Sequence, residues 1–167
     1  METYRQGSLD ALCGVYAIVN SIGTLTDVIQ SPKLFAHIVR KMRSHLPAIL
    51  IEGLTTEEME KFVLAPSVAF CTKQKVSLSY TICPRWAPLD EYWQIMQAHI
   101  AVHGAGSIVL GMAGVQDHWT CVRRITEKSL LLLDSQNLIR LCRRHISIDA
   151  TPAVHHLHPK DTFLLSV

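Results

Sequence analysis

The chain has 167 residues, enough for one globular domain with a substantial core. A hydrophobic fraction of 49% and a charged fraction of 18% exclude a disordered chain. The formal net charge of +2 is too small to indicate nucleic acid or an anionic membrane as a partner. No apolar run reaches the roughly 18 residues of a membrane span. We therefore expect a single domain over residues 1–167, with no nucleic-acid partner and no membrane partner.

The cysteines indicate the redox compartment. They are Cys13, Cys71, Cys83, Cys121 and Cys142, an odd number with wide spacings and no Cys-x-x-Cys. This pattern is typical of reduced thiols and argues against a closed structural zinc site. The segment METYRQGSLD contains an acidic residue and no apolar run, so it does not resemble a secretory signal. We expect a reducing, cytoplasmic compartment, and the alternative is export as an effector by a signal that the sequence does not display.

The first half of the chain is predicted to be helical. Residues 9–22, LDALCGVYAIVNSI, are apolar nearly all round, which predicts a buried helix. Ser8 or Asp10 is the expected N-cap of this helix, and either choice puts Cys13 in or near its first turn. Pro32 predicts the first position of a second helix. Farther on, the capping-box pattern of TTEEMEKFVL predicts a third.

The second half is predicted to consist mainly of strands, with one helix from Pro88 to His103. The expected strands are KVSLSYTI (75–82), SIVLGM (107–112), HWTCVRRIT (118–126), SLLLLDS (129–135), RRHISI (143–148) and DTFLLSV (161–167). The short connection TEKS predicts a hairpin between the third and fourth of these. The expected fold class is α+β, with a helical N-terminal half packed on a mostly antiparallel sheet from the C-terminal half.

Cys13 is the candidate nucleophile. At the start of a helix, unpaired amide groups and the helix dipole favour the thiolate, which is the reactive form of cysteine. The competing interpretation is a small buried core residue, because free cysteine is among the most buried residue types. A nucleophilic thiol also needs an imidazole within reach, held in turn by a third group.

His118 and Asp134 are the candidate base and its orienting partner. His118 opens one strand of the predicted hairpin and Asp134 ends the other, so the two lie at the same edge of the sheet. Asp134 also ends a run of four leucines, where a buried charge needs a partner. The alternative is a turn aspartate beside a solvent-facing histidine. Seven of the other histidines are expected in solvated helix faces (His37, His45, His99, His103) and in a polar loop before the last strand (His155, His156, His158).

Three further residues are expected to assist Cys13, His118 and Asp134. Gln6 lies shortly before Cys13, and its amide could donate to a developing oxyanion together with the Cys13 backbone N–H. Trp119 could shield the His118–Asp134 hydrogen bond from water. Gly14, which lacks a side chain, would leave the thiol open to substrate.

The ordered set of motifs resembles the papain-like cysteine peptidases. The matching pieces are Gln6, LCGVYAIVNS (12–21), DHWTCV (117–122) and LLLDS (131–135). The similarity is to compact members, such as bacterial C39-like peptidases, bacterial effector proteases and deamidases, and Josephin-type deubiquitinases. By this resemblance Cys13 is the nucleophile, His118 the general base and acid, Asp134 the orienting residue and Gln6 the oxyanion donor. Gly14-Val15 after the cysteine separates the chain from the cathepsin-like enzymes.

The resemblance implies a papain-like fold and a thiol hydrolase that cleaves a peptide or isopeptide bond and requires no metal or organic cofactor. The expected partner is a protein or peptide substrate, and a ubiquitin-like conjugate is one candidate. The alternatives are a glutamine deamidase or acyltransferase with the same triad, and a non-catalytic papain-like module that binds a protein. Substrate choice is expected to lie in loops at 64–74 and 83–90.

Overall fold

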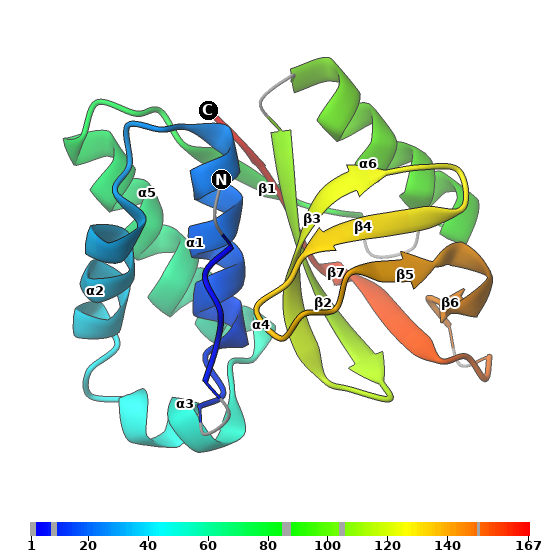
Figure 1. Cartoon of the computed structure of the whole chain (residues 1–167), viewed down its shortest axis with the longest axis horizontal. Coiled ribbons are helices and arrows are strands. Elements are labelled where there is room, and N and C mark those ends of the chain that lie inside the picture. Colours follow the sequence, from blue (N-terminus) through cyan, green and yellow to red (C-terminus); the bar gives the residue numbers. More distant parts are fainter. Residues whose placement is uncertain (1–2, 8–9, 85–87, 104–105, 150) are drawn as a thin grey trace.

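The computed structural model describes residues 3–7, 10–84, 88–103, 106–149 and 151–167 of the chain. Its elements form three layers, in which the helices of the N-terminal half and helix α6 (Leu89–His103) cover opposite faces of one sheet (Figure 1). The packing along one central strand shows this, since Val109 belongs to the core under the N-terminal helices while Ile108 and Leu110 belong to the core under α6. The predicted α+β arrangement is therefore confirmed.

The N-terminal half is helical, as predicted. Its helices are α1 (Cys13–Leu25), α2 (Ser31–Lys41), α3 (Leu46–Glu52), α4 (Thr56–Glu58) and α5 (Ala65–Lys73), with a π-helical stretch over Met59–Leu64 between the last two. Helix α1 stands between the sheet and the other helices (Figure 1). This position explains why α1 is apolar nearly all round, because it packs on two sides. Pro32 is the second helical residue of α2 rather than the first.

Helix α1 begins four residues later than predicted. Its first helical residue is Cys13, and the first hydrogen bond along the helix runs from the Tyr16 N–H to the Leu12 carbonyl at 3.1 Å. Asp10 does not cap the helix, because its carboxylate accepts from the amides of Gly7 at 3.0 Å and Leu12 at 3.1 Å. An aspartate that bonds the amide two residues ahead forms a local turn, which competes with helix formation. Ser8, the other predicted cap, lies outside the described residues.

The capping box before α4 is present as predicted. Thr55 Oγ1 accepts from the Glu58 N–H at 3.3 Å, and the Glu58 carboxylate accepts from the Thr55 N–H at 2.9 Å. The helix that starts here continues without a break through the π-helical stretch and α5. The wider π turn precedes Pro66, whose ring would clash with the carbonyl four residues earlier in α-helical geometry.

Replacing Thr55 with alanine is expected to lower the free energy of unfolding by about 1 kcal/mol, because the Glu58 N–H loses its acceptor, the Thr55 hydroxyl. Urea unfolding of the two proteins measures this difference. The matched control is Thr72→Ala on the exposed surface of α5, which should change the value by less than about 0.5 kcal/mol. Equal effects of the two substitutions would contradict a stabilising cap.

The sheet is mostly antiparallel. Its strands are β1 (Ser79–Ile82), β2 (Gly106–Gly114), β3 (His118–Ile125), β4 (Ser129–Leu133), β5 (Arg140–Cys142), β6 (Ile146–Ser147) and β7 (His155–Ser166). The order is β1-β7-β2-β3-β4-β5, and the short β6 pairs in parallel with β7. Strand β1 is half as long as expected, and RRHISI is a single 3-10 turn followed by β6.

Strand β7 begins earlier than predicted and carries a bulge. Leu110 of β2 pairs with Thr162, whereas Met112 pairs with Leu157. Gly111 alone therefore lies opposite residues 158–161, so this part of β7 bows out of the sheet. A bulge bends its strand and redirects the side chains on it. Two of these side chains, His158 and Asp161, lie near His118 at the start of β3.

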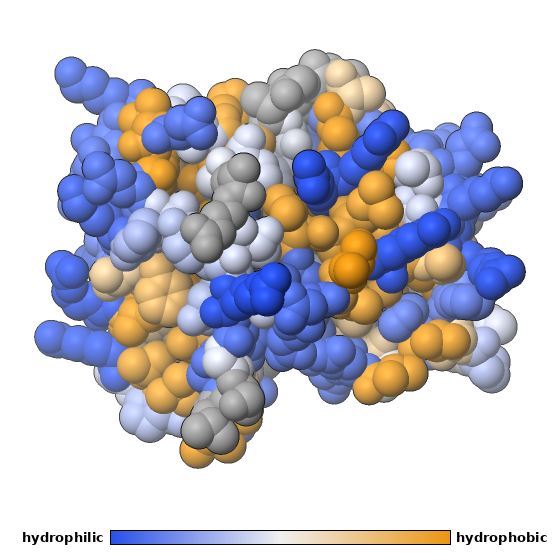
Figure 2. Space-filling view, viewed as in Figure 1, coloured by the Kyte–Doolittle hydropathy of each residue, from blue (hydrophilic) through white to orange (hydrophobic). Residues whose placement is uncertain are grey.

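The core has two parts, one on each face of the sheet. The part under the N-terminal helices includes Trp119 and Phe163, and the part under α6 includes Trp93 and Tyr92. On the face seen in Figure 2, hydrophilic side chains dominate the outer ends of the molecule, with apolar side chains in smaller patches between them. Within the described residues, none of the helices combines the length and the apolar character that crossing a membrane requires.

Candidate active site

Cys13 lies where helix α1 meets the sheet. It is the first helical residue and is 8% exposed. Because the first helical hydrogen bond is donated by Tyr16, the amides of Cys13, Gly14 and Val15 have no acceptor within the helix. The thiol therefore sits beside the positive end of a helix that is 13 residues long. This is an environment that stabilises a thiolate or any other anion.

His118 and Asp134 form a buried pair. His118 Nε2 lies 2.6 Å from Asp134 Oδ2, and the two side chains are 1% and 0% exposed. The hairpin brings them together as predicted, because Cys121 pairs with Leu133 and the strands continue from there to His118 and Asp134. The second carboxylate oxygen of Asp134 accepts from the amides of Gln136 at 2.8 Å and Leu138 at 3.0 Å. Both oxygens of the carboxylate are thus held in place.

The electrostatics of the pair favour its charged form. Burial lowers the pKa of His118, but hydrogen bonds to Asp134 and Cys13 outweigh it and raise the pKa to about 9. Burial raises the pKa of Asp134, but the hydrogen bond from His118 contributes to a net shift below its usual value. At neutral pH the pair is therefore an imidazolium beside a carboxylate.

The thiol of Cys13 lies on the other side of the imidazole. His118 Nε2 is engaged with Asp134, and the interaction of the ring with Cys13 leaves Nδ1 as the nitrogen on the side of the thiol. Nδ1 is buried and has no hydrogen-bond partner of standard geometry among the described residues. An N–H of a buried imidazolium next to sulfur is a proton donor that can also hold a thiolate by its charge.

A cleft opens beside these residues. It has a volume of about 270 Å³ and is lined by Cys13, Glu52, Leu54, Thr55, Thr56, Gly111, Met112, Ala113, Asp117, His118, Trp119, His158 and Asp161. The lining comes from the α3–α4 connection, the β2–β3 hairpin and the bulge of β7. The nucleophile and base predicted from the sequence thus share a cleft with side chains that the sequence-based prediction did not include.

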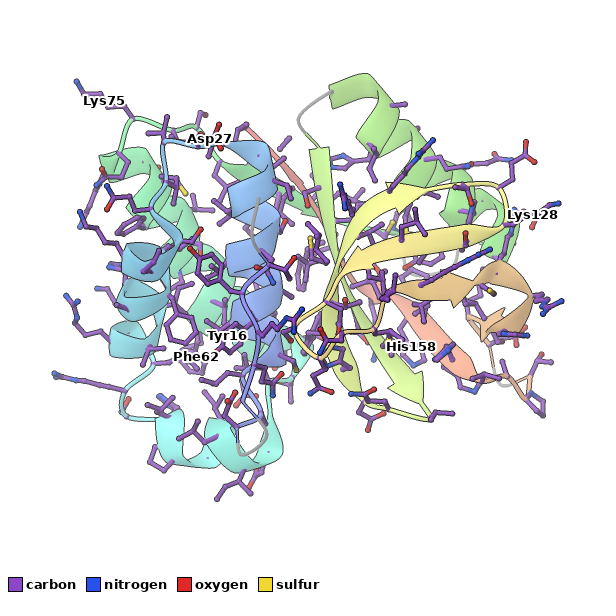
Figure 3. The ribbon with its side chains drawn as sticks, in the orientation of Figure 1. Tyr16, Asp27, Phe62, Lys75, Lys128 and His158 are labelled. Carbon is purple, nitrogen blue, oxygen red and sulfur yellow. The ribbon has the colours of Figure 1, made fainter. Side chains whose placement is uncertain are left out.

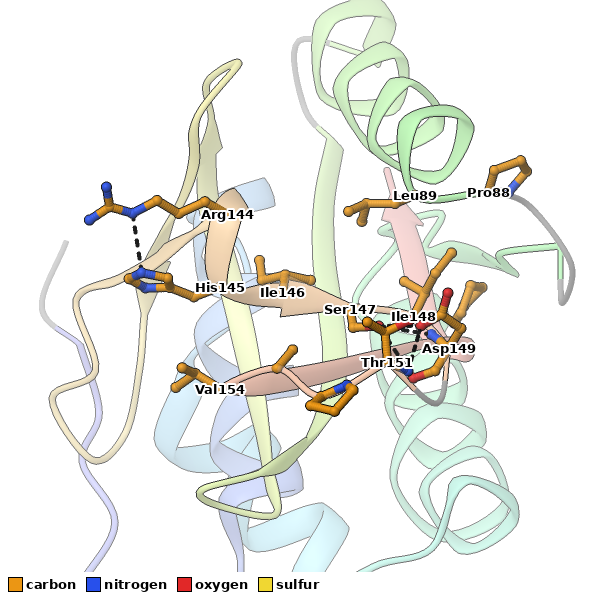
Figure 4. Close-up of a pocket in the computed structure, with 13 residues that line it drawn as sticks. Pro88, Leu89, Arg144, His145, Ile146, Ser147, Ile148, Asp149, Thr151 and Val154 are labelled. Carbon is orange, nitrogen blue, oxygen red and sulfur yellow. Dashed lines mark hydrogen bonds between the residues drawn. The ribbon is translucent and has the colours of Figure 1, made fainter.

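A larger cavity, of about 790 Å³, lies elsewhere and offers less chemistry (Figure 4). Its wall contains a turn in which Asp149 accepts from Ser147 Oγ at 2.7 Å and from the Thr151 N–H at 2.8 Å. Hydrogen bonds from the side chains of Thr151 and Ser147, and then from the Thr151 N–H, lower the pKa of Asp149 to about 2. The polar groups of this turn satisfy one another, so the turn is structural.

Gln6 lies beside the loop that follows Asp134. Its backbone N–H donates to the Ser135 carbonyl at 3.1 Å, and its side-chain oxygen accepts from Gln136 Nε2 at 3.3 Å. Its side-chain nitrogen donates to the Asp10 carbonyl, which leaves one hydrogen of that amide for another acceptor. Gln6 is not one of the described residues that line the cleft. Its role as an oxyanion donor stays a prediction, and its observed contacts tie the N-terminal segment to the β4–β5 connection.

Trp119 and Gly14 both lie close to Leu54, a residue that lines the cleft. The Trp119 Nε1–H donates to the Leu54 carbonyl at 2.8 Å, and its ring stacks on Phe163 at 5.8 Å between centroids. Shielding of the histidine by Trp119 stays a prediction. The expectation that Gly14 leaves the thiol open stays a prediction; a Cβ at this position would lie 2.8 Å from Met59 Sδ and 3.1 Å from Leu54 Cδ1. The glycine allows α1 to approach these residues closely.

Several histidines are placed differently from the prediction. His155, His156 and His158 belong to β7 and not to a loop. His99 Nε2 contacts the Leu165 carbonyl at 2.8 Å, so this side of α6 packs on the sheet. His37 is half-buried against the ring of Phe70, whereas His45 is exposed as expected. Within the described residues, no group of three or more potential ligands could hold a metal ion.

The remaining cysteines contrast with Cys13. Burial raises the pKa of Cys71, Cys83 and Cys121 to about 11. Cys142 is half-buried on β5 at the edge of the sheet. Among the described residues that line the cleft, Cys13 is the one cysteine.

Within the described residues, neither of the predicted specificity segments lines the cleft. Residues 65–73 form helix α5, which packs against α2, and part of the 83–90 segment lies outside the described residues. The cleft residues that sequence reasoning missed are Thr56 and the acidic Glu52, Asp117 and Asp161. A signal for Asp161 existed, because Pro159 within a strand is typical of a bulge or an edge.

The sequence matches no family model, and no curated protein matches it. The chemistry of the site is therefore inferred from the residues of this chain alone. They are a thiol at a helix N-terminus, an imidazolium beside it, and a buried carboxylate that fixes the imidazolium.

Proposed function

We propose that the protein is a cysteine hydrolase of the papain-like kind, which cleaves an amide bond in a protein or peptide. The proposal rests on one observation: Cys13 starts a helix beside His118 in one cleft, and the buried Asp134 is hydrogen-bonded to His118 behind it. Acyl-transfer enzymes commonly contain a nucleophile that contacts a base, and an orienting group that contacts the base in turn. The support for the papain-like assignment is the cysteine-bearing helix packed on an antiparallel sheet that carries the other two residues.

In the first step, the sulfur of Cys13 attacks the scissile carbonyl carbon. The carbonyl oxygen becomes an oxyanion at the N-terminus of α1, where the unpaired amides of Cys13 and Gly14 are available to stabilise it. The Nδ1–H of His118 then protonates the leaving nitrogen, the C–N bond breaks, and an acyl thioester remains on Cys13.

In the second step, water hydrolyses the thioester. His118, now neutral, takes a proton from the water as the water attacks the carbonyl carbon. The C–S bond breaks, the acid is released, and the thiolate–imidazolium pair is restored. Asp134 stays ionised throughout and holds the imidazole with Nε2 toward itself. Nδ1 is therefore the nitrogen that donates and accepts the proton in both steps.

The same thioester forms from a peptide, an isopeptide or a glutamine side chain. Deamidation or acyl transfer to an amine are accordingly the alternative outcomes of this chemistry. The measured product distinguishes them, since deamidation releases ammonia and acyl transfer consumes an added amine. A ubiquitin-like conjugate belongs among the isopeptide substrates to be tested.

The test of the proposal is the alkylation rate of each cysteine by iodoacetamide, followed by mass spectrometry between pH 5 and 9. At pH 6, Cys13 is expected to react at least about tenfold faster than Cys142, because Cys13 lies at a helix N-terminus beside the imidazolium of His118. His118→Ala is expected to remove that advantage.

The matched control is His45→Ala, an exposed histidine on the helical half that should leave the rate at Cys13 unchanged. If Cys13 reacts no faster than Cys142 in the folded wild-type protein, or equally fast without His118, the proposed hydrolase is wrong. The same outcome would favour a papain-like module that binds a protein without cleaving it.

A further inference from the structure

The cleft beside Cys13 is lined by acidic side chains that the proposed chemistry does not use. Glu52, Asp117 and Asp161 all line it. The chain as a whole has the opposite bias, with 16 basic and 14 acidic residues. Carboxylates are thus concentrated at the cleft, although the chain as a whole has a net positive charge.

Asp161 is delivered to the cleft by the bulge of β7. Regular pairing with β2 stops at Thr162 and resumes at Leu157, so Asp161 is the residue at which the strand leaves the sheet. Gly111 faces it, and a Cβ added there would lie 3.1 Å from the Asp161 Cβ. The absence of a side chain at residue 111 gives the bulge room to approach the cleft.

The bulge is fixed from both sides. The Thr162 hydroxyl donates to the His158 carbonyl across the bulge at 3.3 Å, and it also meets the hydroxyl of the buried Tyr92 at 2.7 Å. The carboxylate of Asp161 accepts from the Thr56 hydroxyl, which belongs to the opposite wall. A carboxylate held in this way keeps one position, and its other oxygen stays available to accept hydrogen bonds.

The cleft acids have no cationic partner within the described part of the chain. The ion pairs found there are His118–Asp134 and Arg143–Asp90, and neither involves a cleft acid. The charge of His118 is already matched by Asp134. Cys13 and His118 line the same cleft as these acids, so the acids and the reactive groups face one space. A space with unbalanced negative charge attracts a cation and repels an anion.

We propose that Asp161 determines substrate specificity by binding the lysine or arginine side chain of a peptide substrate in the cleft, assisted by Asp117 and Glu52. This inference rests on the proposed hydrolase. A guanidinium or ammonium group meets a carboxylate by charge-assisted hydrogen bonds, which Asp161 can accept without losing its contact to Thr56. Cleavage is expected next to a basic residue and to be disfavoured next to an acidic one.

The first experiment compares two small thiol reagents that differ in charge. Cys13 attacks the sulfenyl sulfur of a methanethiosulfonate, a mixed disulfide forms, and methanesulfinate leaves with the electron pair. The reagents are the cationic 2-aminoethyl and the anionic 2-sulfonatoethyl compounds, and each rate is divided by its rate with free glutathione. The normalised preference for the cation is expected to fall by about threefold to tenfold in Asp161→Asn, and to shrink in 0.5 M salt for the wild type.

The matched control is Asp27→Asn, since Asp27 is exposed beyond the C-terminal end of α1, far from His158 (Figure 3). It should leave the preference unchanged. Asp117→Asn should lower the preference in the same direction as Asp161→Asn, which keeps the test valid if the latter folds poorly. An unchanged preference in both cleft variants overturns the inference.

The second experiment separates this inference from the proposed function. A peptide library with arginine, glutamine or glutamate at each position around the cleaved bond is digested by wild type and Asp161→Asn. The wild type is expected to prefer arginine at one position by at least about tenfold, and the variant to lose most of that preference. Cleavage that requires Cys13 but shows no charge preference overturns the specificity and leaves the hydrolase intact. A charge preference in labelling without cleavage of any amide supports the acidic cleft and contradicts the hydrolase.

Discussion

Replacing Cys13 with alanine is expected to lower amide hydrolysis by at least about 10³-fold, because Cys13 supplies the one thiol among the described residues that line the cleft. His118→Ala is expected to cause a loss of similar size. Residues that act as one unit are not additive, so the double variant should be no worse than either single one. Cleavage of a basic peptide library, followed by mass spectrometry, measures all three rates.

Cys142→Ala is the control for this prediction. Cys142 is half-buried at the edge of the sheet, outside the cleft, and its loss should leave the rate unchanged. Far-ultraviolet circular dichroism and thermal unfolding check that each variant folds. A Cys13→Ala protein that retains more than about a tenth of the activity would remove Cys13 from the mechanism.

The pairing of His118 with Asp134 was predictable because it depends on local geometry. A short turn fixes the register of a hairpin, and the TEKS turn closes as expected through the hydrogen bond from Thr126 to Ser129. The register shifts between Val122 and Arg124, and the start of β3 still lies near the end of β4. A charge at the end of a leucine run added a reason to expect a partner for Asp134, and that partner is present.

The start of α1 was harder to predict because two local structures compete there. Asp10 can cap a helix or close a turn on the amide two residues ahead, and both uses are common for aspartate. The structure contains the turn, which moves the helix start to Cys13. This later start favours the proposed chemistry, since it puts Cys13 closer to the positive end of the helix than predicted.

The cleft walls could not be predicted because they come from long-range pairing. Asp161 and Thr56 are 105 positions apart and meet only when β7 bulges toward the α3–α4 connection. Read alone, the histidine-rich segment before Asp161 has the composition of a polar loop. Pro159 was the available indication of irregular pairing, but a proline does not say which side chain the bulge presents.

Asp134→Asn is the second prediction with a large effect, and it concerns stability. The pKa of His118 is raised to about 9, so its contribution is fully present below its unfolded value near 6.5 and is lost as the pH rises through about 9. The pKa of Asp134 is lowered, so its contribution is present above its unfolded value and is lost as the pH falls through the folded one. Stabilisation by the pair should therefore be greatest between about pH 4 and 6.5.

Asparagine keeps the shape of Asp134 but removes its charge, which leaves a buried imidazolium unpaired at pH 6. The loss of stability there should be about 3 kcal/mol, and it should shrink by pH 9.5, where the wild-type histidine has itself lost its proton. Thermal unfolding of both proteins at the two pH values measures the change. The control is Asp90→Asn, which removes the exposed ion pair with Arg143 and should cost less than about 1 kcal/mol at either pH. A loss for Asp134→Asn that does not depend on pH would mean that Asp134 acts through its hydrogen bonds alone, and that the buried pair is neutral.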